Sequence, residues 1–482
     1  MHRFGGLRAA LVAVLICAFV TPGAWSQYFW SDPFGADSKV TPAPGVRWEP
    51  SSPLPAVTMP AAPERLQSTA PLSLPELTEF ALRNNPKAKQ AWFAARAAAA
   101  GVGIEQADRL PQITANYNIS RTQQISATTG AIVPWQTRFG PSISLSYLLF
   151  DFGVRESQIE SAEYRLLAAN LSQNRVLQDI VFQVEQAYYL LIGVEELVRV
   201  NELSLKNIQT ALDAAQRRRE SGLATVADVY RTETQVAQAQ LNLTRSRGDF
   251  EKARGQLANA VGLPVNGNIS VQTLSAPPQI REIATSLNDL LERAKTSRPD
   301  LVAAEAQARA ARANAKATSK AGLPSIEITS TAAHTLFGDD RPSANSYSLA
   351  LNLRIPLFSG FRDTYSVRQA EAQASQAEAA RDTLYKQTEL DVWQAYYDLQ
   401  TAASGISSTE AQVKSAEQTA QATLARYQAG FGSILDLITA QLDESNARVQ
   451  RVQSYLNWFT ALARLNFSIG MSDILTATSE KK

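Results

Sequence analysis

The chain has 482 residues, of which 45% are hydrophobic and 19% charged, and its formal net charge is +1 at pH 7. Such a balance gives no reason to expect a nucleic-acid partner. It contains one cysteine, two histidines and no G-x-S-x-G, P-loop or histidine cluster. Because the common catalytic and metal-binding motifs are missing, we expect neither an enzyme nor a protein that binds a cofactor or a metal.

Residues 1–26 are predicted to be a secretory signal peptide. A basic start precedes an apolar run over residues 9–20, and small residues at 24 and 26 suit cleavage before Gln27. The run is shorter than the ~20 apolar residues that a membrane-spanning helix needs. Cys17 lies inside it, but Ile16 is bulky where lipoprotein signals carry a small residue. This favours a plain signal peptide over lipid attachment.

Residues 27–72 are predicted to form an extended N-terminal arm, because eleven of the 22 prolines fall in the first 75 residues. No run of 18 apolar residues follows the signal, so no transmembrane helix is expected. At the other end, residues 472–482 read as a C-terminal tail.

Two kinds of helix are predicted between these ends. Helical patterns with a proline break cover residues 77–110 and 287–323, and the breaks fall at Pro86 and Pro299. Longer patterns with apolar residues at alternating steps of three and four cover residues 154–221 and 362–429, and each is followed by a shorter helix, 226–261 or 434–469. Such a period predicts left-handed coiled coils about 100 Å long.

Four segments of alternating apolar and polar residues lie between the broken helices and the long ones. They span about residues 111–125, 137–149, 324–336 and 345–357. Alternation with aromatic residues near the ends suits a half-buried soluble sheet or the strands of a membrane barrel. The soluble sheet is the usual interpretation of one such hairpin, but the long helices favour the barrel.

The second half of the chain repeats the first at an offset of 208 residues. From Leu149 to Leu263 the match needs no insertion or deletion. We therefore expect two tandem repeats, residues 73–285 and 286–471. Two short helices stacked end to end, one from each repeat, would match each long helix: 226–261 with 287–321, and 434–469 with 77–107.

Four strands cannot close a barrel, and in lipid an open edge would leave backbone groups without hydrogen-bond partners. Membrane strands in this chain therefore require several copies combined in a ring, whose helices would form a second hollow cylinder. A periplasm-spanning structural tether is the alternative from another class. It explains the heptads but not four amphipathic strands at one end.

Three motifs now carry a resemblance. Leu149-Phe150 is followed by Gly153, Leu357-Phe358 by Gly360, and Tyr427-Gln-Ala-Gly430 by Ile434-Leu-Asp-Leu437. With the repeats, these residues resemble the TolC-type outer membrane efflux proteins over about residues 73–471. The resemblance implies a mainly α protein with membrane β-structure: a homotrimer whose 12-stranded barrel continues into a 12-helix tunnel.

The resemblance also implies a place and a role. The trimer would lie in the outer membrane of a Gram-negative bacterium, extend into the periplasm, and dock to a periplasmic adaptor and an inner-membrane pump. It would serve as an exit duct for small molecules such as drugs and metabolites. An exit duct for type I protein secretion is the alternative within the family, because substrate choice is made largely by the pump.

The turns between long and short helices are the expected periplasmic tips. Their residues are Gly222, Leu223, Ala224 and Thr225 in the first repeat, and Gly430, Phe431, Gly432 and Ser433 in the second. Glycine suits a helix end in a left-handed conformation, and Thr or Ser suits an N-cap. The resemblance adds that adaptor hairpins seat beside these turns, and an apolar Phe431 on a turn favours partner contact.

Asp228 and Asp436 each lie one turn into the helix that follows a tip. A charge that favours the helix N-terminus explains both without a further role. The resemblance implies instead that Asp436 faces inward, so that three carboxylates surround a closed aperture and select cations. Thr439 stands where similar channels carry a second acidic residue, so the ring should be less acidic.

Asp228 and Tyr427 match positions that tie neighbouring helices together in the closed state of similar channels. A basic partner expected near Gly432 is missing, so this periplasmic latch should be weaker. Opening would then be an untwisting of the inner helices.

Overall fold

The computed structural model of the protein describes residues 71–123, 125, 128, 130–266, 269–272, 286–338 and 341–471. The predicted signal peptide, the arm up to residue 70 and the predicted C-terminal tail lie outside the described residues. The chain divides into the units Met1–Pro63 and Glu64–Lys482. Everything described below belongs to the second unit.

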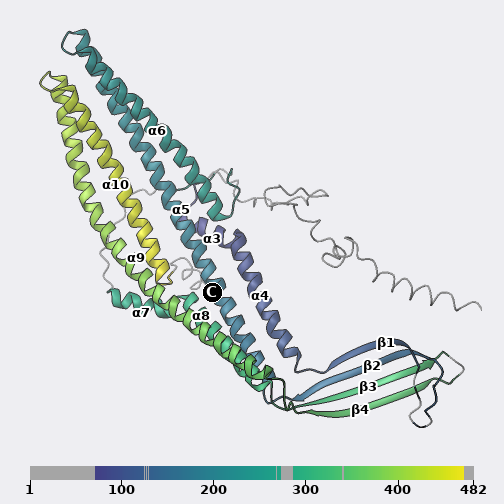
Figure 1. Ribbon diagram of the computed structural model, residues 1–482. Helices are drawn as coiled ribbons and strands as arrows, with labels where there is room; N and C mark the ends of the chain where they lie inside the picture. The colour runs from purple at the N-terminus through teal and green to yellow at the C-terminus, as the bar shows by residue number, and fades with distance from the viewer. Residues whose placement is uncertain are drawn as a thin grey trace, which may run out of the picture. The chain divides into compact units, whose positions relative to one another are not determined.

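The described part of the chain is mainly helical and has four strands (Figure 1). In chain order the elements are α3 Leu74–Asn84, α4 Pro86–Ala107, β1 Gln112–Thr122, β2 Gln136–Phe150, α5 Val154–Glu220, α6 Val226–Val261, α7 Leu287–Ser297, α8 Pro299–Lys320, β3 Ser325–Phe337, β4 Ala344–Arg354, α9 Arg362–Gln428 and α10 Ile434–Ser468. The two long helices, α5 and α9, begin at the predicted residues and end one residue earlier than predicted.

Asn85 separates α3 from α4, at the predicted proline break. Its side chain accepts a hydrogen bond from the Lys87 backbone N–H at 2.9 Å, and its Nδ2 donates to the Ala260 carbonyl oxygen at 3.0 Å. Pro86 supplies the first residue of α4, a position where a backbone N–H has no partner inside the helix. Asn85 thus caps one helix and ties it to the end of α6.

Arg298 joins four helices at the second proline break, and only 3% of it is exposed. Its Nη2 lies 2.6 Å from an Asp300 oxygen on α8, and its Nη1 lies 3.4 Å from an Asp391 oxygen on α9. From α5, Arg175 reaches the same Asp300 carboxylate at 3.7 Å and lies 3.8 Å over the ring of Phe467 on α10. Buried charges are stable only when paired, so this cluster fixes the relative positions of the four helices.

The two long helices organise the packing. Each has 67 residues, on the order of 100 Å at the α-helical rise. Helices α4 and α6 pack chiefly against α5, whereas α8 and α10 contact both α5 and α9 (Figure 1). Among the described residues, no substantial contact joins α9 to α4 or α6.

The buried face of α9 has the spacing of a coiled coil. Its buried side chains recur every seven residues along most of the helix, at Val392, Leu399, Ile406, Val413, Ala420 and Tyr427. Several of them pack against an apolar row on α10 that includes Trp458 and Leu465. A seven-residue repeat keeps one stripe of the helix facing its neighbour, which is why the helix can be so long without a globular core around it.

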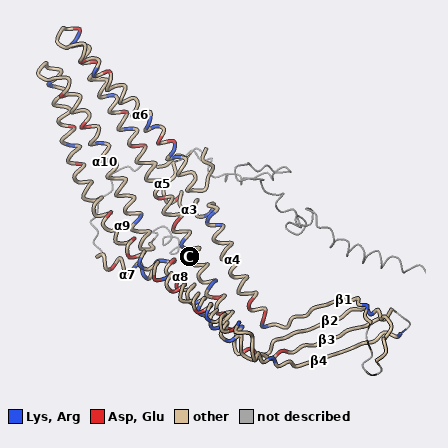
Figure 2. The backbone as a smooth tube through the Cα atoms, viewed as in Figure 1, with Lys and Arg blue, Asp and Glu red and all other residues tan. Residues whose placement is uncertain are grey.

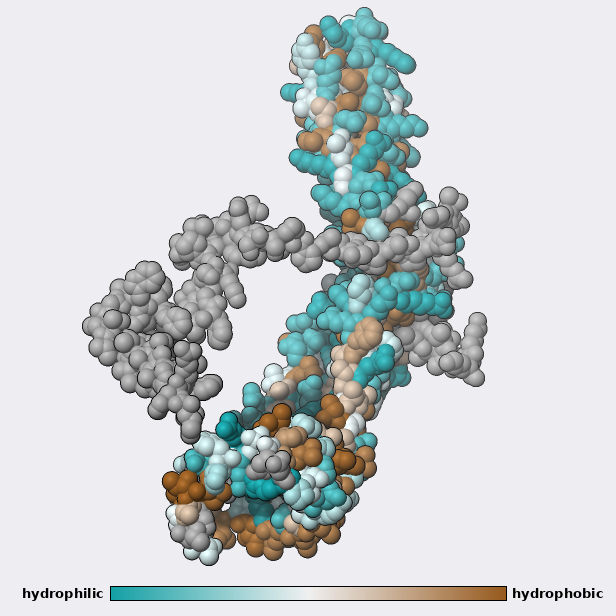
Figure 3. Space-filling view, turned by 90° about the vertical axis from the view of Figure 1, so that its right-hand side faces the viewer, coloured by the Kyte–Doolittle hydropathy of each residue, from teal (hydrophilic) through white to brown (hydrophobic). Residues whose placement is uncertain are grey.

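The four strands form one antiparallel sheet in the order β1-β2-β3-β4. The register places Ile113 opposite Leu145, Leu145 opposite Ser330, and Ser330 opposite Leu349, so one face of the sheet is mostly apolar. The other face aligns polar side chains: Thr114, Ser144, Thr331 and Ser348. In Figure 3 hydrophobic residues gather around the outside of the sheet, at the bottom of the view, and hydrophilic ones lie within. Among the described strands, β1 and β4 are edges.

Charged residues are frequent along the helices and sparse along the strands (Figure 2). No helix in the described part of the chain is apolar over a length that would cross a membrane.

Candidate functional site

The first hairpin tip follows α5. Gly222 takes a φ of 73°, which favours glycine because a side chain would be strained there. Thr225 then caps α6: its side chain accepts from the Asp228 backbone N–H at 3.2 Å, and the Asp228 carboxylate accepts from the Thr225 N–H at 2.9 Å. These reciprocal bonds lower the pKa of Asp228, and the backbone bond is the largest cause. Ala224 lies half-buried inside the turn.

The second hairpin tip, after α9, has the same local structure. Gly430 takes a φ of 91°, and the Ser433 side chain accepts from the Asp436 backbone N–H at 3.1 Å. Gly432 has space for little more than hydrogen, since a Cβ there would lie 3.2 Å from the Tyr427 nitrogen. Both residues predicted to be N-caps, Thr225 and Ser433, are confirmed as N-caps.

Each tip exposes one large apolar side chain at its outermost point. Leu223 is 67% exposed and Phe431 is 81% exposed. Behind them an apolar cluster joins the two hairpins: Ala211, Ala215, Val229, Tyr427, Ile434, Leu437 and Ile438. The two tips therefore form one packed unit with two apolar side chains projecting from it.

Arg218, near the end of α5, is the main polar contact between the hairpins. Its Nη1 donates to the Tyr427 carbonyl oxygen at 2.7 Å, and its guanidinium lies 4.6 Å from the centre of the Tyr427 ring. Its Nη2 also donates to the Leu223 carbonyl oxygen at 3.4 Å. A basic side chain therefore binds a carbonyl in the last turn of α9, where the helix dipole favours it, and a carbonyl of the first hairpin turn.

Sequence reasoning missed Arg218 and looked for a basic residue near Gly432. The sequence feature that could have identified Arg218 is the run Arg217-Arg218-Arg219 at the end of the first long helix. The resemblance assigned no role to this run. The fold brings Arg218 across from the first repeat, so the hairpins are joined without a cation at Gly432.

Asp228 and Tyr427 lie near the same cluster, but no hydrogen bond joins them among the described residues. The Asp228 carboxylate binds Thr225, and the Tyr427 hydroxyl is buried without a hydrogen-bond partner. Burial raises the pKa of Tyr427, against the opposing charge of Arg218. Tyr427 therefore contacts Arg218 of the other hairpin through its backbone carbonyl and its ring.

Asp436 and Thr439 lie one turn apart at the start of α10, and both are exposed. Because no described residue of the chain covers either side chain, both are accessible to solvent or to another molecule at the tip.

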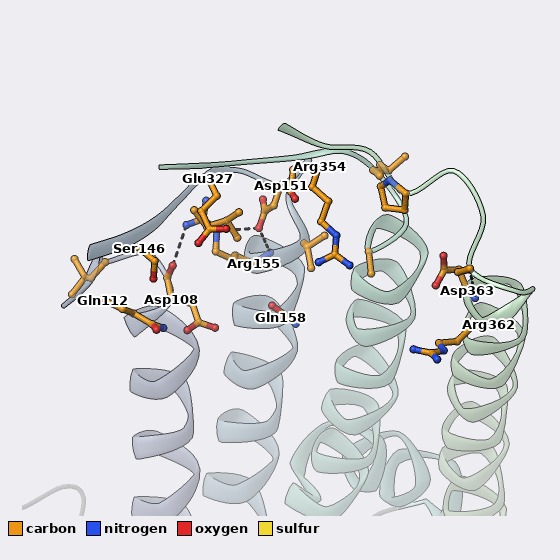
Figure 4. Close-up of a pocket in the computed structure, with 18 residues that line it drawn as sticks. Asp108, Gln112, Ser146, Asp151, Arg155, Gln158, Glu327, Arg354, Arg362 and Asp363 are labelled. Carbon is orange, nitrogen blue, oxygen red and sulfur yellow. Dashed lines mark hydrogen bonds and ion pairs between the residues drawn. The ribbon is translucent and has the colours of Figure 1, made fainter. Parts of the chain in front are cut away.

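A second polar site lies at the opposite end of the helices, where they meet the sheet (Figure 4). It is an open pocket of about 580 Å³ lined by residues of β1, β2, β3, β4, α5 and α9, among them Glu327, Arg354 and Asp363. Asp151 and Arg155 point toward each other there, with Arg155 Nε 3.0 Å from the carboxylate. Burial raises the pKa of Asp151, but backbone N–H groups and the Arg155 guanidinium outweigh it and leave that pKa lowered.

The pocket continues the polar face of the sheet. Gln112 and Ser146 line it and are opposite each other in the β1–β2 register. A continuous polar surface therefore runs from the strands to the first turns of the long helices. No cluster of three or more His, Cys, Asp or Glu residues suited to a metal ion occurs among the described residues.

The chain matches the family model for the outer membrane efflux protein over residues 77–263 and 290–471. It is 29% identical over 406 residues to protein CyaE of Bordetella pertussis, which covers 83% of this chain and 84% of that one. It is 25% identical over 482 residues to the pyoverdine export outer membrane protein OpmQ of Pseudomonas putida, with 95% of each covered.

A solved structure shares the fold. A membrane protein from Pseudomonas aeruginosa superposes with a TM-score of 0.75 at 25% identity, over 82% of this chain and 93% of that one. Since the family model covers well over half of the chain, in two segments that contain both hairpin tips, the protein belongs to the outer membrane efflux protein family and is an efflux channel of the outer membrane.

Proposed function

We propose that this protein is a homotrimeric exit duct that conducts small molecules, such as drugs and metabolites, from an inner-membrane pump and a periplasmic adaptor to the cell exterior. The observation that carries the proposal is the sheet: one face is apolar, the other is polar, and its two edge strands, β1 and β4, are unpaired among the described residues.

The apolar face and the open edges fit lipid only in a ring of copies. Each unpaired backbone group in hydrocarbon costs several kcal/mol, so strands in a bilayer must close on themselves. If β4 of one copy pairs with β1 of the next, three copies close a barrel of twelve strands. The polar face then lines the lumen.

The helices favour the same closure. The chain runs from α4 into β1 and from β4 into α9, so the open side of α9 continues the open edge of β4. Helices α4 and α6 continue the edge of β1. A ring closed through β4 and β1 therefore also closes a tunnel of coiled coils, in which residues 73–285 and 286–471 act as two similar units.

The small-molecule assignment is supported by the composition of the duct and by one relative. The polar pocket at the base of the sheet would leave the passage hydrated where barrel and tunnel meet. OpmQ, which matches nearly the whole chain, is named for pyoverdine export.

The hairpin tips are the proposed docking points for the adaptor. Leu223 and Phe431 project from turns that otherwise consist of small residues and are exposed, and two large exposed apolar side chains on one packed unit suit a protein partner. Gly222, Ala224, Thr225, Gly430, Gly432 and Ser433 would shape the two turns that receive it.

The tips are also the proposed periplasmic gate. In a trimer, Asp436 would contribute three carboxylates to the aperture, with Thr439 one turn farther in. Tyr427 and Asp228 would hold the closed arrangement together with Arg218, and the gate would open by an untwisting of the helices that carry Asp436.

Heat-modifiable migration of the outer-membrane fraction tests the trimer. We expect an unheated band near three times the mass of the heated one, and adaptor that copurifies with the native chain but not with a Phe431→Asp variant. A protein recovered as a soluble monomer would end the proposal. A stable trimer that retains the adaptor with Phe431→Asp would contradict the tip assignment alone.

A further inference from the structure

An aromatic face of α9 has no partner among the described residues of its own chain. Leu390, Trp393 and Tyr397 are 46%, 50% and 43% exposed, and their spacing of three and four residues places them on one side of the helix. The Trp393 and Tyr397 rings lie 4.9 Å apart. Three large half-exposed side chains on two turns of a helix indicate a surface that is covered in the assembled protein.

The corresponding face of α5 is covered. The 208-residue offset carries Leu390 and Tyr397 back to Phe182 and Tyr189. Phe182 stacks on Phe467 of α10 at 4.6 Å, and Tyr189 stacks on Phe459 of the same helix at 4.4 Å. Since α10 covers this face of α5, we expect another helix to cover the equivalent face of α9.

The same offset identifies that helix. Subtracting 208 residues maps α10 onto α6. Helix α6 packs chiefly against α5, and among the described residues the opposite side of α6 is open. Within one chain α6 makes no substantial contact with α9, so the helix that covers α9 is α6 of a second copy.

The contacts between α5 and α10 supply the register. Glu185 and Ala463 line the same small cavity between these helices. Moved by the offset, that pair becomes Trp393 on α9 and Gly255 on α6. The indole would thus lie against a residue without a side chain.

Gly255 and Gly248 are open on the surface of α6, since a Cβ at either would meet nothing within 4 Å. Glycine inside a helix costs about 1 kcal/mol relative to alanine, so two of them seven residues apart need a packing reason. Gly193 on α5 has one, because Leu456 of α10 lies directly against it. Gly255 would have an equivalent one if Trp393 of another copy packs there.

The strands support the same relation. In the β2–β3 register Ile143 lies opposite Ala332. Strand β1 precedes β3 by 213 residues and β2 precedes β4 by 208, so the equivalent pair between copies is Leu351 opposite Ile119. Both belong to the apolar face, which a shift of one residue would break.

We propose that Trp393 of one subunit seats against Gly255 of the next, and that this contact sets the register of the seam between copies. The proposal rests on the homotrimer proposed above and names the surfaces that meet in it. Within the chain, α10 supplies the large side chain (Leu456) and α5 the glycine (Gly193). At the seam between copies, the large side chain (Trp393) would come from α9 and the glycine (Gly255) from α6.

Cysteine cross-linking tests the register. Because the only cysteine of the chain, Cys17, lies in the predicted signal peptide, the pair Gly255→Cys and Trp393→Cys should give covalent dimers and trimers on oxidation, seen on non-reducing gels. The control pair, Gly248→Cys and Trp393→Cys, should give roughly tenfold less, because seven residues shift a helix by about 10 Å, beyond disulfide reach. Each single variant should give no covalent product.

Separate outcomes distinguish the register from the trimer. A heat-modifiable trimer in which the control pair cross-links as well as or better than the first pair, or in which neither does, overturns the register and leaves the homotrimer standing. A native chain recovered without any heat-modifiable trimer would overturn both.

A second variant avoids introduced thiols. Trp393→Ala should lower the temperature at which the native trimer dissociates in detergent, whereas Trp135→Ala, which removes a similarly exposed tryptophan outside the helices, should leave it unchanged. An unchanged temperature for Trp393→Ala, or an equal fall for both, overturns the inference.

Discussion

Arg218 combines a hydrogen bond to the Tyr427 carbonyl with a stacked guanidinium over the same residue's ring. Charge-assisted hydrogen bonds and cation–π contacts are together worth about 2–4 kcal/mol. We expect Arg218→Ala to loosen the tips and raise the open probability of single channels in planar bilayers. Arg217→Ala, at an exposed neighbour, is the matched control and should behave as the native channel.

Tyr427→Phe refines that experiment. The hydroxyl is buried without a hydrogen-bond partner, so its removal should leave gating unchanged, while the ring and the backbone carbonyl still hold Arg218. Opening by Tyr427→Phe as large as that by Arg218→Ala would show that the hydroxyl also joins the hairpins.

Asp436 carries a prediction of a different kind, because its effect depends on charge at the aperture. Three carboxylates in a narrow ring favour cations, so Asp436→Ala should lower the cation-to-anion permeability ratio measured from reversal potentials in planar bilayers. Asp443→Ala removes another exposed carboxylate, two turns along α10, and should have little effect. Unchanged selectivity with Asp436→Ala would remove its gate role.

At the scale of the elements, the Arg298 cluster decides how the broken and unbroken helices fit together. Asp300 and Asp179 both lie near Arg175, but their pKa values move in opposite directions. Burial raises the pKa of Asp300, yet the Arg298 hydrogen bonds and the Arg175 charge outweigh it and leave that pKa lowered. Burial raises the pKa of Asp179 and is not outweighed.

The opposite shifts predict opposite pH dependences. A carboxyl with a lowered folded-state pKa stabilises the protein above its unfolded value, near 3.9, and the contribution is lost as pH falls through the folded-state pKa. Asp300→Asn should therefore cost about 3 kcal/mol of unfolding free energy at pH 7, because Arg298 and Arg175 each lose one carboxylate partner, and the cost should fall as the pH drops through the folded-state pKa. Asp179→Asn should stabilise the protein at pH 7, and this gain should vanish as pH falls.

Thermal unfolding in detergent, followed by circular dichroism from pH 3 to pH 8, measures both variants. If the two show the same pH dependence, the assigned directions are wrong for at least one of them.

At the scale of the whole molecule, the two faces of the sheet should differ in whether they tolerate a charged side chain. Leu351 lies on the apolar face of β4, and its neighbour Asn352 lies on the polar face. A lysine facing lipid near the bilayer midplane costs about 2–4 kcal/mol. Leu351→Lys should therefore reduce the heat-modifiable trimer recovered from the outer membrane, and Asn352→Lys should not. The reverse result would mean that the polar face meets the lipid.

Much of the fold could be predicted because its signals are local. The spans of α5 and α9 follow from an uninterrupted period of three and four, and the break before α4 follows from one proline. The caps Thr225 and Ser433 follow from their place after a glycine turn. Each depends only on residues a few positions apart.

What the sequence alone determined was therefore the kind, length and order of the elements, together with the apolar and polar sides of each strand, since periodicity is a property of neighbouring residues. Only the tertiary structure decided that Arg218 meets Tyr427, that Arg298 is buried among four helices, and that Trp393 remains uncovered. Those contacts join residues far apart in the chain. The sequence contains many arginines and aromatic residues that could form each such contact, and only the packing of the helices determines which one does.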